Sequence, residues 1–470
     1  MFTKFILNKK LLLNILKKMH FLYKLASLLG IDQAVFFTSF ARIIQGLGGI
    51  VSMVFIAKYL TGIEQGFYFT FSSILAIKVF FELGLNGIIT QYVAHEVANL
   101  SLEKDQYVGE IKNMSRMASL LHFFIKWYSV LGLGLFLILS TTGYVFFKNF
   151  YLNEAGVDWI IPWILLSFGT TIYFLISPFA AFIEGLGMVK EIAKIRFFEQ
   201  IGTLITLWSG LVFGLKLYVG GMSLLVGMLI LCFFILKHFY TLLKNIYSIN
   251  ISEKVSYVKE ILPYQWKIAV SWISGYFIFQ LFNPVIFATE GAVAAGQMGM
   301  TIAAISAIQS LSLSWINTKV PLFSNLIALR KYLELDKIFN VTLKQSVFIN
   351  GSALIILFLV ITLVRKYNII IDGTYLGDRF LDNFPMLLMM ITIFLNQYVF
   401  SWATYLRCHK KEPLLVMSVV NALLCSLSII LMQKYYGLIG ITFGYCIITF
   451  FTLIWTYSIF KNKKKKWHSI

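Results

Sequence analysis

Apolar runs of about 20 residues recur along this chain from residue 34 to residue 460. As a helix rising 1.5 Å per residue, a run of that length spans the roughly 30 Å hydrocarbon core of a bilayer. Hydrophobic residues make up 59% of the 470 residues and charged residues only 13%, about half the charged share of a soluble domain. The bilayer therefore constrains the fold, and we expect a polytopic membrane protein.

Windows of about 19 residues predict twelve membrane-spanning helices. In the first half of the chain they cover 34–57, 67–90, 123–147, 160–183, 197–214 and 218–238. In the second half they cover 268–288, 292–316, 342–364, 384–405, 414–432 and 437–459. The alternating pattern of a membrane β-barrel strand is missing from these runs, so we expect an all-α protein.

Positive charge is divided unevenly between the two sets of connecting segments. Of the 40 Lys and Arg residues, 30 fall on the side that carries both termini, seven fall on the opposite side, and Arg42, Lys78 and Lys126 fall within spans. Because short cytoplasmic loops are enriched in Lys and Arg, we expect both termini in the cytoplasm. A net charge of +19 that is spread loop by loop along one membrane face argues against nucleic-acid binding.

The loops follow the same order in both halves of the chain: tight outer hairpin, long inner loop, acidic outer loop, short inner loop, tight outer turn. We therefore predict an N-terminal six-helix lobe over 31–240, a cytoplasmic linker over 241–267 and a C-terminal six-helix lobe over 268–460. A basic amphipathic segment (1–30) precedes them and a basic tail (461–470) follows. Parallel repeats of this kind share an axis along the membrane normal and are typical of transporters, with a binding site between the lobes.

Residues 30–96, "GIDQAVFFTSFARIIQGLGGIVSMVFIAKYLTGIEQGFYFTFSSILAIKVFFELGLNGIITQYVAHE", resemble the opening of the O-antigen and polysaccharide repeat-unit flippases. Those proteins belong to the MATE-like MOP exporter superfamily. The resemblance implies two lobes that rock around a central cavity. Its implied cargo is an oligosaccharide linked to a polyprenyl diphosphate, flipped across the bacterial inner membrane for O-antigen, lipopolysaccharide or capsule assembly. It also implies polysaccharide polymerase and chain-length proteins as partners.

Three charged residues lie inside the first two predicted spans. Lys78 is central in its span, while Arg42 and Glu82 lie at similar depths on adjacent antiparallel helices, so the sequence predicts that they pair. Glu82 follows Lys78 by four residues and would share its face in a continuous helix. Because a charge at a helix centre costs roughly 2.5 to 3.5 kcal/mol, such residues usually face a watery cavity or a partner.

One carboxylate with two cations predicts a net positive cavity wall, which would attract the diphosphate of a lipid-linked sugar. Two plainer interpretations stay open: Lys78 and Glu82 neutralise each other at a seam between lobes, or Arg42 extends towards the inner headgroups, as we expect for Lys126. Titration of Glu82 could couple transport to protons, although two neighbouring cations favour its ionised form.

Uncharged polar residues within spans are less specific. They could bind sugar hydroxyls, but hydrogen bonds between helices explain them as well. These residues are Gln45, Gln91, Gln280, Asn283, Gln309, Asn396 and Gln397. Glu184, Arg196 and Glu199 cluster near the predicted inner mouth, as a gate or a solvated rim. The four cysteines and six histidines show no spacing that indicates disulfides or a metal site, and we expect no cofactor.

Other function classes fit the sequence less well. A MATE-type drug or cation antiporter is the main alternative, although its cationic substrate would favour an acidic cavity. A polymerase or glycosyltransferase would need larger extramembrane loops, so we expect no enzymatic activity. The nucleotide-binding pattern G-x-x-x-x-G-K-[ST] does not occur in the sequence, which leaves an H⁺, Na⁺ or substrate gradient as the energy source.

Overall fold

Membrane-length helices form most of the chain in the computed structural model, which describes residues 46–468 except 47, 105, 152–155, 372–373 and 410. An apolar helix, Gly48–Tyr59, comes first. It is followed in the N-terminal half by α3 (Gly62–Leu75), α4 (Val79–Glu82), α5 (Leu85–Val97), α6 (Ile111–Phe150), α7 (Ile160–Gly185), α8 (Val189–Val212) and α9 (Tyr218–Tyr247). The C-terminal half contains α10 (Leu262–Phe279), α11 (Phe282–Glu290), α12 (Ala292–Asn317), α13 (Val320–Ala328), α14 (Tyr332–Lys366), α15 (Asn383–Arg407) and α16 (Leu415–His468).

Nine helical segments of the described chain are long and apolar enough to cross a membrane. All but the last two residues of the predicted span 197–214 lie in α8, a helix outside those nine that also carries charged residues. Spans 414–432 and 437–459 both lie in α16, whose backbone leaves the helical region at Gly437 (φ 57°, ψ −146°). Span 34–57 falls largely outside the described residues, so the total of twelve stays a prediction.

The two arms of α16 form an antiparallel pair around Gly437. The hydroxyl of Thr452 on the second arm donates to Asn421 Oδ1 on the first (2.9 Å), and that of Thr456 contacts Met417 Sδ (3.0 Å). Gly437 is suited to this reversal because its positive φ is strained for residues with a Cβ.

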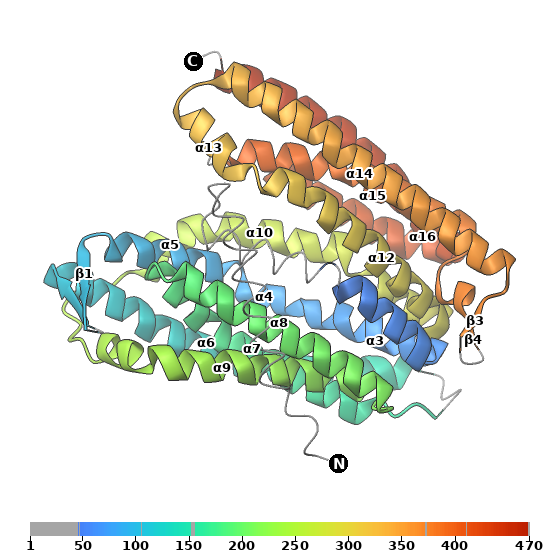
Figure 1. Cartoon of the computed structure of the whole chain (residues 1–470), viewed down its shortest axis with the longest axis horizontal. Helices are drawn as coiled ribbons and strands as arrows, with labels where there is room; N and C mark the ends of the chain where they lie inside the picture. The colour runs from blue at the N-terminus through green and yellow to red at the C-terminus, as the bar shows by residue number, and fades with distance from the viewer. Residues whose placement is uncertain are drawn as a thin grey trace, which may run out of the picture.

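Two short hairpins lie at opposite ends of the molecule (Figure 1). Strands β1 (Leu100–Glu103) and β2 (Gln106–Gly109) pair antiparallel, with Leu100 opposite Gly109, in the loop between α5 and α6. Strands β3 (Ile370–Ile371) and β4 (Thr374–Tyr375) pair antiparallel between α14 and α15. We call the end that carries β1, β2, α13 and the C-terminus the splayed end, and the end that carries β3 and β4 the closed end.

At the closed end, α3 and α12 bring the two halves together through small residues. A Cβ at Gly66 would overlap the carbonyl oxygen of Ala292, and a Cβ at Gly296 would lie 2.9 Å from Gly66 N. Gln65 Nε2 donates to the carbonyl oxygens of Gly296 (2.8 Å) and Arg379 (3.0 Å). Backbone can therefore approach backbone here, as at the small-residue helix crossings of other membrane proteins.

The start of α3 is fixed by a capping box. Thr61 Oγ1 accepts from Glu64 N (3.2 Å), and Glu64 Oε2 accepts from Thr61 N (2.9 Å), which satisfies two donors at the start of the helix. Lys216, in the turn between α8 and α9, forms an ion pair with Glu64 (2.8 Å). The N-terminus of α3 is thereby tied to its own half beside the contact with α12.

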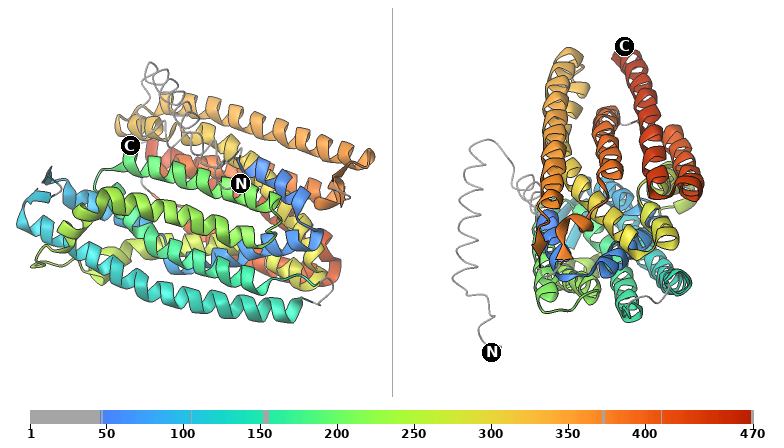
Figure 2. Two further views of the ribbon diagram at one scale, coloured as in Figure 1. Left: turned by 60° about the horizontal axis from the view of Figure 1, so that its bottom comes forward. Right: turned by 90° about the vertical axis from the view of Figure 1, so that its right-hand side faces the viewer.

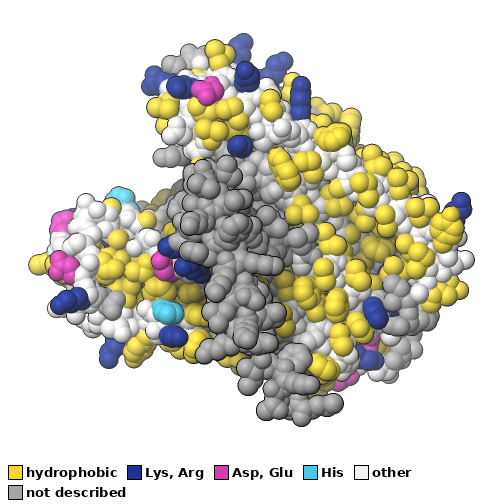
Figure 3. All heavy atoms as spheres, in the orientation of Figure 1, with side chains coloured by type: hydrophobic (Ala, Val, Ile, Leu, Met, Phe, Trp, Pro, Cys, Tyr) yellow, Lys and Arg dark blue, Asp and Glu magenta, His cyan; other side chains and the backbone are white. Residues whose placement is uncertain are grey.

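Away from the closed end the halves diverge (Figures 1 and 2). The outline of the molecule is indented between them at the splayed end (Figure 3). The largest cluster of buried side chains includes Phe67, Trp163 and Phe147 of the N-terminal half and Phe287 of the C-terminal half. A separate cluster, around Phe323, Phe339 and Tyr405, packs the splayed end of the C-terminal half. Each half therefore has packing of its own where the two separate.

The segment between α9 and α10 docks on the N-terminal half. Arg116 of α6 pairs with Glu96 of α5 (2.9 Å) and with Glu260 of the segment (2.6 Å). Ser115 Oγ accepts from Glu253 N (2.8 Å), and the hydroxyl of Tyr92 donates to the Glu260 carbonyl oxygen (2.6 Å). Hydrogen bonding to Arg116 lowers the pKa of the Glu260 carboxyl below its ordinary value of 4.5.

The first prediction concerns the crossing of α3 and α12. We expect Gly66→Leu to lower the free energy of unfolding in detergent by about 1–3 kcal/mol, because the added side chain must force the two backbones apart. A matched control is Gly87→Ala in α5, where a Cβ meets no described atom within 4 Å. Equal melting temperatures for Gly66→Leu and the unmodified protein would contradict the packing described here.

The second prediction concerns Glu260. A carboxyl whose pKa is lowered by folding stabilises the protein above its unfolded pKa, and that contribution disappears as pH falls through the lowered value. We expect Glu260→Gln to lose roughly 1–2 kcal/mol at pH 7 and to show a flatter decline below about pH 4.5, measured by thermal unfolding between pH 3 and 7. Glu253→Gln should differ little from the unmodified protein, because its pair with Lys112 is long (4.0 Å) and exposed. Parallel pH profiles for Glu260→Gln and Glu253→Gln would count against the Arg116 contact.

Candidate functional site

The α3–α5 segment is interrupted at its two charged residues. A 3₁₀ turn, Ala76–Lys78, follows α3, and α4 covers only Val79–Glu82. Leu83 and Gly84 then adopt positive φ values of 48° and 71° before α5 begins. This break corrects the expectation of one continuous helix over 67–90. Interrupted helices of this kind form binding sites in several transporter folds.

Gly84 is required at the break for two reasons. Its positive φ is strained for other residues, and a Cβ there would lie 2.5 Å from Ile268 Cγ2 on α10. Phe80 of α4 also packs against the ring of Tyr276 on α10, with the ring centroids 5.1 Å apart. The interrupted helix therefore contacts the C-terminal half directly at the level of its charges.

Glu82 accepts a hydrogen bond from Asn86, which also contacts polar side chains of two other helices. Asn86 Nδ2 of α5 donates to Glu82 Oε1 (2.8 Å) and lies 3.2 Å from Ser177 Oγ of α7. Asn86 Oδ1 in turn accepts from the hydroxyl of Tyr128 on α6 (3.1 Å). Because the amide uses both its donor and its acceptor, it fixes the orientation of the carboxylate.

Lys78 is half-buried and faces α7. Its Nζ lies 5.6 Å from the centroid of the Tyr173 ring, within the range of a cation–π contact, and it interacts electrostatically with Glu82. The hydroxyl of Tyr173 is hydrogen-bonded to Glu199 on α8. Lys78 is therefore linked through one aromatic side chain to a second carboxylate.

The charged residues near the predicted inner mouth are connected to Lys78 through Glu199. Arg196 pairs with Glu184 across α8 and α7 (3.1 Å) and interacts electrostatically with Glu199. We call the connected set the N-terminal charge network; it consists of Lys78, Glu82, Asn86, Tyr128, Tyr173, Ser177, Glu184, Arg196 and Glu199. The sequence pointed to its charged members, but Asn86, Tyr128 and Tyr173 carried no signal that separates them from ordinary polar or aromatic residues of a span.

The network is larger than the set of Arg42, Lys78 and Glu82 for which the sequence predicts a net positive wall. The described members include two cations, Lys78 and Arg196, and three carboxylates, Glu82, Glu184 and Glu199. Arg42 and Gln45, which the sequence also placed at the site, lie outside the described residues. The proposed pairing of Arg42 with Glu82 therefore stays a prediction.

The polar residues predicted in the C-terminal half separate into two groups. Gln309 and Gln397 bond between helices: Gln309 Nε2 donates to the Ile393 carbonyl oxygen (3.4 Å), and Gln397 Nε2 donates to Ser346 Oγ. Fully buried Asn350 on α14 leaves both amide atoms without a hydrogen-bond partner among the described residues, and sequence reasoning missed it.

Asn396 instead lines a cavity of about 170 Å³ between α10, α15 and α16. Its amide lies beside the Tyr445 hydroxyl. Asn283 is buried at the start of α11, and Gln280 is half-buried at the junction of α10 and α11. The described residues contain no convergent group of three His, Cys, Asp or Glu side chains that could hold a metal ion.

The third prediction tests whether Lys78 and Glu82 are coupled. In a double-mutant cycle of Lys78→Met and Glu82→Gln, we expect a coupling free energy of about 1 kcal/mol, because each single change leaves a charge without its partner. Unfolding of the four proteins in detergent measures it. The control cycle pairs Glu82→Gln with Lys126→Met, whose side chain is exposed on α6, and should be additive. Additivity in both cycles would refute the coupling.

Sequence comparisons gave no match to a protein-family model and none to a curated protein. Solved structures do match over most of the chain. The lipid II flippase MurJ in an inward closed conformation is 15% identical with a TM-score of 0.58, covering 90% of this chain and 87% of that chain. The MATE multidrug transporter DinF-BH is 12% identical with a TM-score of 0.60, covering 91% of this chain and 93% of that chain.

A MOP superfamily transporter from Pyrococcus furiosus is also similar. It is described by a reversed polarity of its binding pocket and is 13% identical, with a TM-score of 0.55 and coverage of 93% of this chain and 97% of that chain. At such identities the likeness establishes the fold alone. This chain therefore has a MATE- and MurJ-like fold, as the sequence resemblance implied.

Proposed function

We propose that this protein is a secondary transporter that flips a polyprenyl-diphosphate-linked oligosaccharide across the bacterial inner membrane. The observation that carries the proposal is the N-terminal charge network at a helix break, within a fold shared with a lipid II flippase. Ionisable groups within membrane segments are functional by default because of their cost in hydrocarbon. The sequence resemblance to repeat-unit flippases points to O-antigen or capsule as the assembled polymer.

The arrangement of the halves supports alternating access. Gln65 and the glycines of α3 and α12 hold the closed end together, while the halves diverge at the other end. Most of the described Lys and Arg residues lie in segments at the splayed end, so we assign that end to the cytoplasm by the positive-inside rule. In this conformation cargo would enter from the cytoplasmic side, and breaking the contact of α3 with α12 would open the opposite side.

Lys78 is the proposed contact for the diphosphate. It lies near the middle of the segment Gly62–Val97, where a low dielectric strengthens attraction to an anion. Glu82, oriented by Asn86, would hold the ammonium between cargo cycles, and Arg42 would add a second cation. Gln280, Asn283 and Asn396 are the proposed contacts for sugar hydroxyls. An H⁺ or Na⁺ gradient would drive the cycle, and polymerase and chain-length proteins would use the product.

A MATE-type antiporter of cationic compounds is the second candidate. The three carboxylates in the described network favour it, because a cationic cargo is stabilised by negative charge. Fold likeness does not separate the two, since MurJ and multidrug transporters match this chain equally well. Whether Lys78 binds an anionic cargo therefore decides between the flippase and the antiporter.

The fourth prediction uses Lys78→Met in a strain that lacks the native gene. We expect polymer display to fall by roughly 30-fold or more and lipid-linked repeat units to accumulate, because the cation proposed to bind the diphosphate is removed and a loss of about 2 kcal/mol of its attraction corresponds to that factor. Lys78→Arg keeps the cation and should retain part of the activity. Lys126→Met removes an exposed cation from α6 and should leave display unchanged.

Three results would reject the flippase. Normal display by Lys78→Met at an equal membrane level would remove the assigned role of that residue. Absence of accumulated repeat units in the deletion strain would remove the lipid-linked cargo. Loss of cationic-dye efflux in the same strain, with normal polymer display, would establish the antiporter instead.

A further inference from the structure

A pocket of about 760 Å³ opens at the splayed end of the C-terminal half. It lies between the turn that joins α13 to α14 and the last turns of α16, which are about 130 residues apart in the sequence. Its lining combines five Lys and Arg side chains and two carboxylates with Tyr332, Leu333 and His468. The N-terminal charge network has no residue in it, so this pocket is separate from the proposed transport site.

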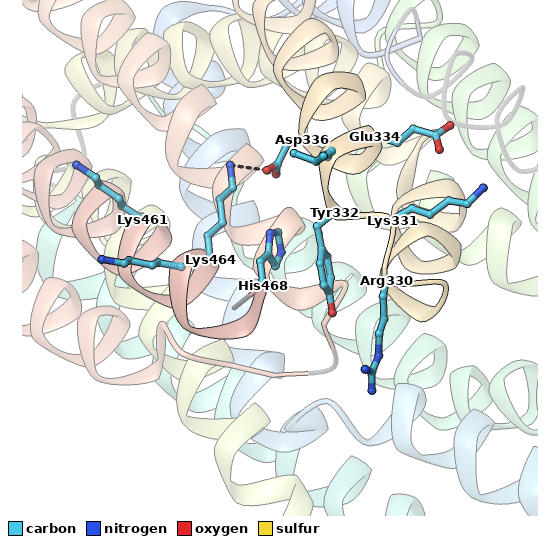
Figure 4. A pocket seen from close by; sticks show the side chains of 10 residues that line it. Arg330, Lys331, Tyr332, Glu334, Asp336, Lys461, Lys464 and His468 are labelled. Carbon is cyan, nitrogen blue, oxygen red and sulfur yellow. Dashed lines mark ion pairs between the residues drawn. The ribbon is translucent and has the colours of Figure 1, made fainter. Parts of the chain in front are cut away.

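The centre of the pocket is a fixed arrangement of rings and one carboxylate (Figure 4). The Tyr332 and His468 rings stack with centroids 4.1 Å apart. Asp336 accepts from the hydroxyl of Tyr405 (2.7 Å) and pairs with Lys464 (2.9 Å). The charge of Asp336 is therefore already compensated within the protein.

The remaining cations flank these rings. Figure 4 places Arg330 and Lys331 on one side of the stack and Lys461 on the other. Within the described part of the chain, Arg330, Lys331, Lys461 and Lys465 form no ion pair, and the remaining acidic side chain of the lining is Glu334. The lining includes Tyr332, the first residue of α14, and the N-terminus of a 35-residue helix favours an anion.

Two exposed leucines lie in or beside the pocket: Leu333 is part of its lining, and Leu329 precedes the lining residue Arg330 in the sequence. Leu333 is 89% exposed and Leu329 is 58% exposed, although both adjoin basic residues. The membrane-length segments Tyr332–Lys366 and Leu415–His468 begin or end in the pocket. Basic and apolar side chains gather on this part of the surface (Figure 3). Exposed leucines beside lysines form an amphipathic surface, which is typical of segments that bind a membrane.

We propose that this pocket binds the phosphate-bearing headgroup of an anionic membrane phospholipid. The flanking cations neutralise the phosphate, and the ring stack forms the wall between them. Basic pockets between membrane helices on the cytoplasmic side are suited to such headgroups. Because α13, α14 and α16 meet here, a bound lipid would join three elements of the C-terminal half.

The test measures lipid binding by the full-length protein in native mass spectrometry, with phosphatidylglycerol and phosphatidylcholine as probes. The pocket variant combines Arg330→Asn, Lys461→Gln and Lys465→Gln. Asn is chosen at residue 330 because φ there is +58°, a conformation that Asn tolerates well. At about fivefold per cation, we expect phosphatidylglycerol affinity to fall on the order of 100-fold, with little phosphatidylcholine binding by either protein.

The matched control combines Lys319→Gln, Lys337→Gln and Lys344→Gln, three exposed lysines at the same end that do not line the pocket. It loses the same net charge and should bind phosphatidylglycerol as the unmodified protein does. Equal losses of phosphatidylglycerol affinity in both variants would show that general surface charge, and not this pocket, attracts the lipid. That result would overturn the proposal.

A second binding measurement, with a soluble anion, distinguishes a lipid headgroup from free phosphate as the ligand. Tight binding of inorganic pyrophosphate to the pocket residues, without preference for phosphatidylglycerol, would replace the lipid with a soluble ligand and overturn the assignment. If the triple variant does not fold, the single change Arg330→Asn serves in its place. We expect about a fivefold loss from it, and unchanged phosphatidylglycerol affinity would overturn the proposal.

Discussion

The cost of placing charge in hydrocarbon is the constraint on which the N-terminal half depends. A charged side chain at a helix centre costs at least about 2.5 kcal/mol, and both Lys78 and Glu82 lie near the middle of a membrane-length segment. The structure offsets that cost locally, through Asn86 on the carboxylate and the Tyr173 ring beside the ammonium. Apolar residues at both positions would avoid this cost, and for that reason we assign the two charges to the proposed transport function.

The closed end joins the two halves, and the break in the helix lets the same segment change direction beyond that contact. Gly66 and Gly296 allow α3 to approach α12 so closely that the two halves are joined at one end, while the turn at Leu83 and Gly84 lets the rest of the segment take another direction. The segment between α9 and α10 is fixed to the N-terminal half through Arg116 and Glu260. A change of access would therefore move α10 and the following helices against a rigid N-terminal half.

Hydropathy alone predicted most of the helices, because the bilayer demands long apolar segments whatever their tertiary contacts. The break at Leu83 was not predictable: Leu is a good helix former, and only the packing of Gly84 against Ile268 favours the left-handed turn there. The sequence located Lys78, Glu82, Glu184, Arg196 and Glu199 but treated them as two sites. Their connection through Tyr173 depends on the relative rotation of α7 and α8, which sequence periodicity does not specify.

The central claim is that residue 78 faces a water-filled path from the splayed end. The direct measurement is the reactivity of Lys78→Cys towards a charged, membrane-impermeant thiol reagent, in a chain whose native Cys232, Cys408, Cys425 and Cys446 are replaced by Ala. The account predicts modification from the cytoplasmic side and protection by lipid-linked oligosaccharide. A residue 78 that stays unreactive from both sides, while a cysteine at exposed Glu103 reacts, would contradict it.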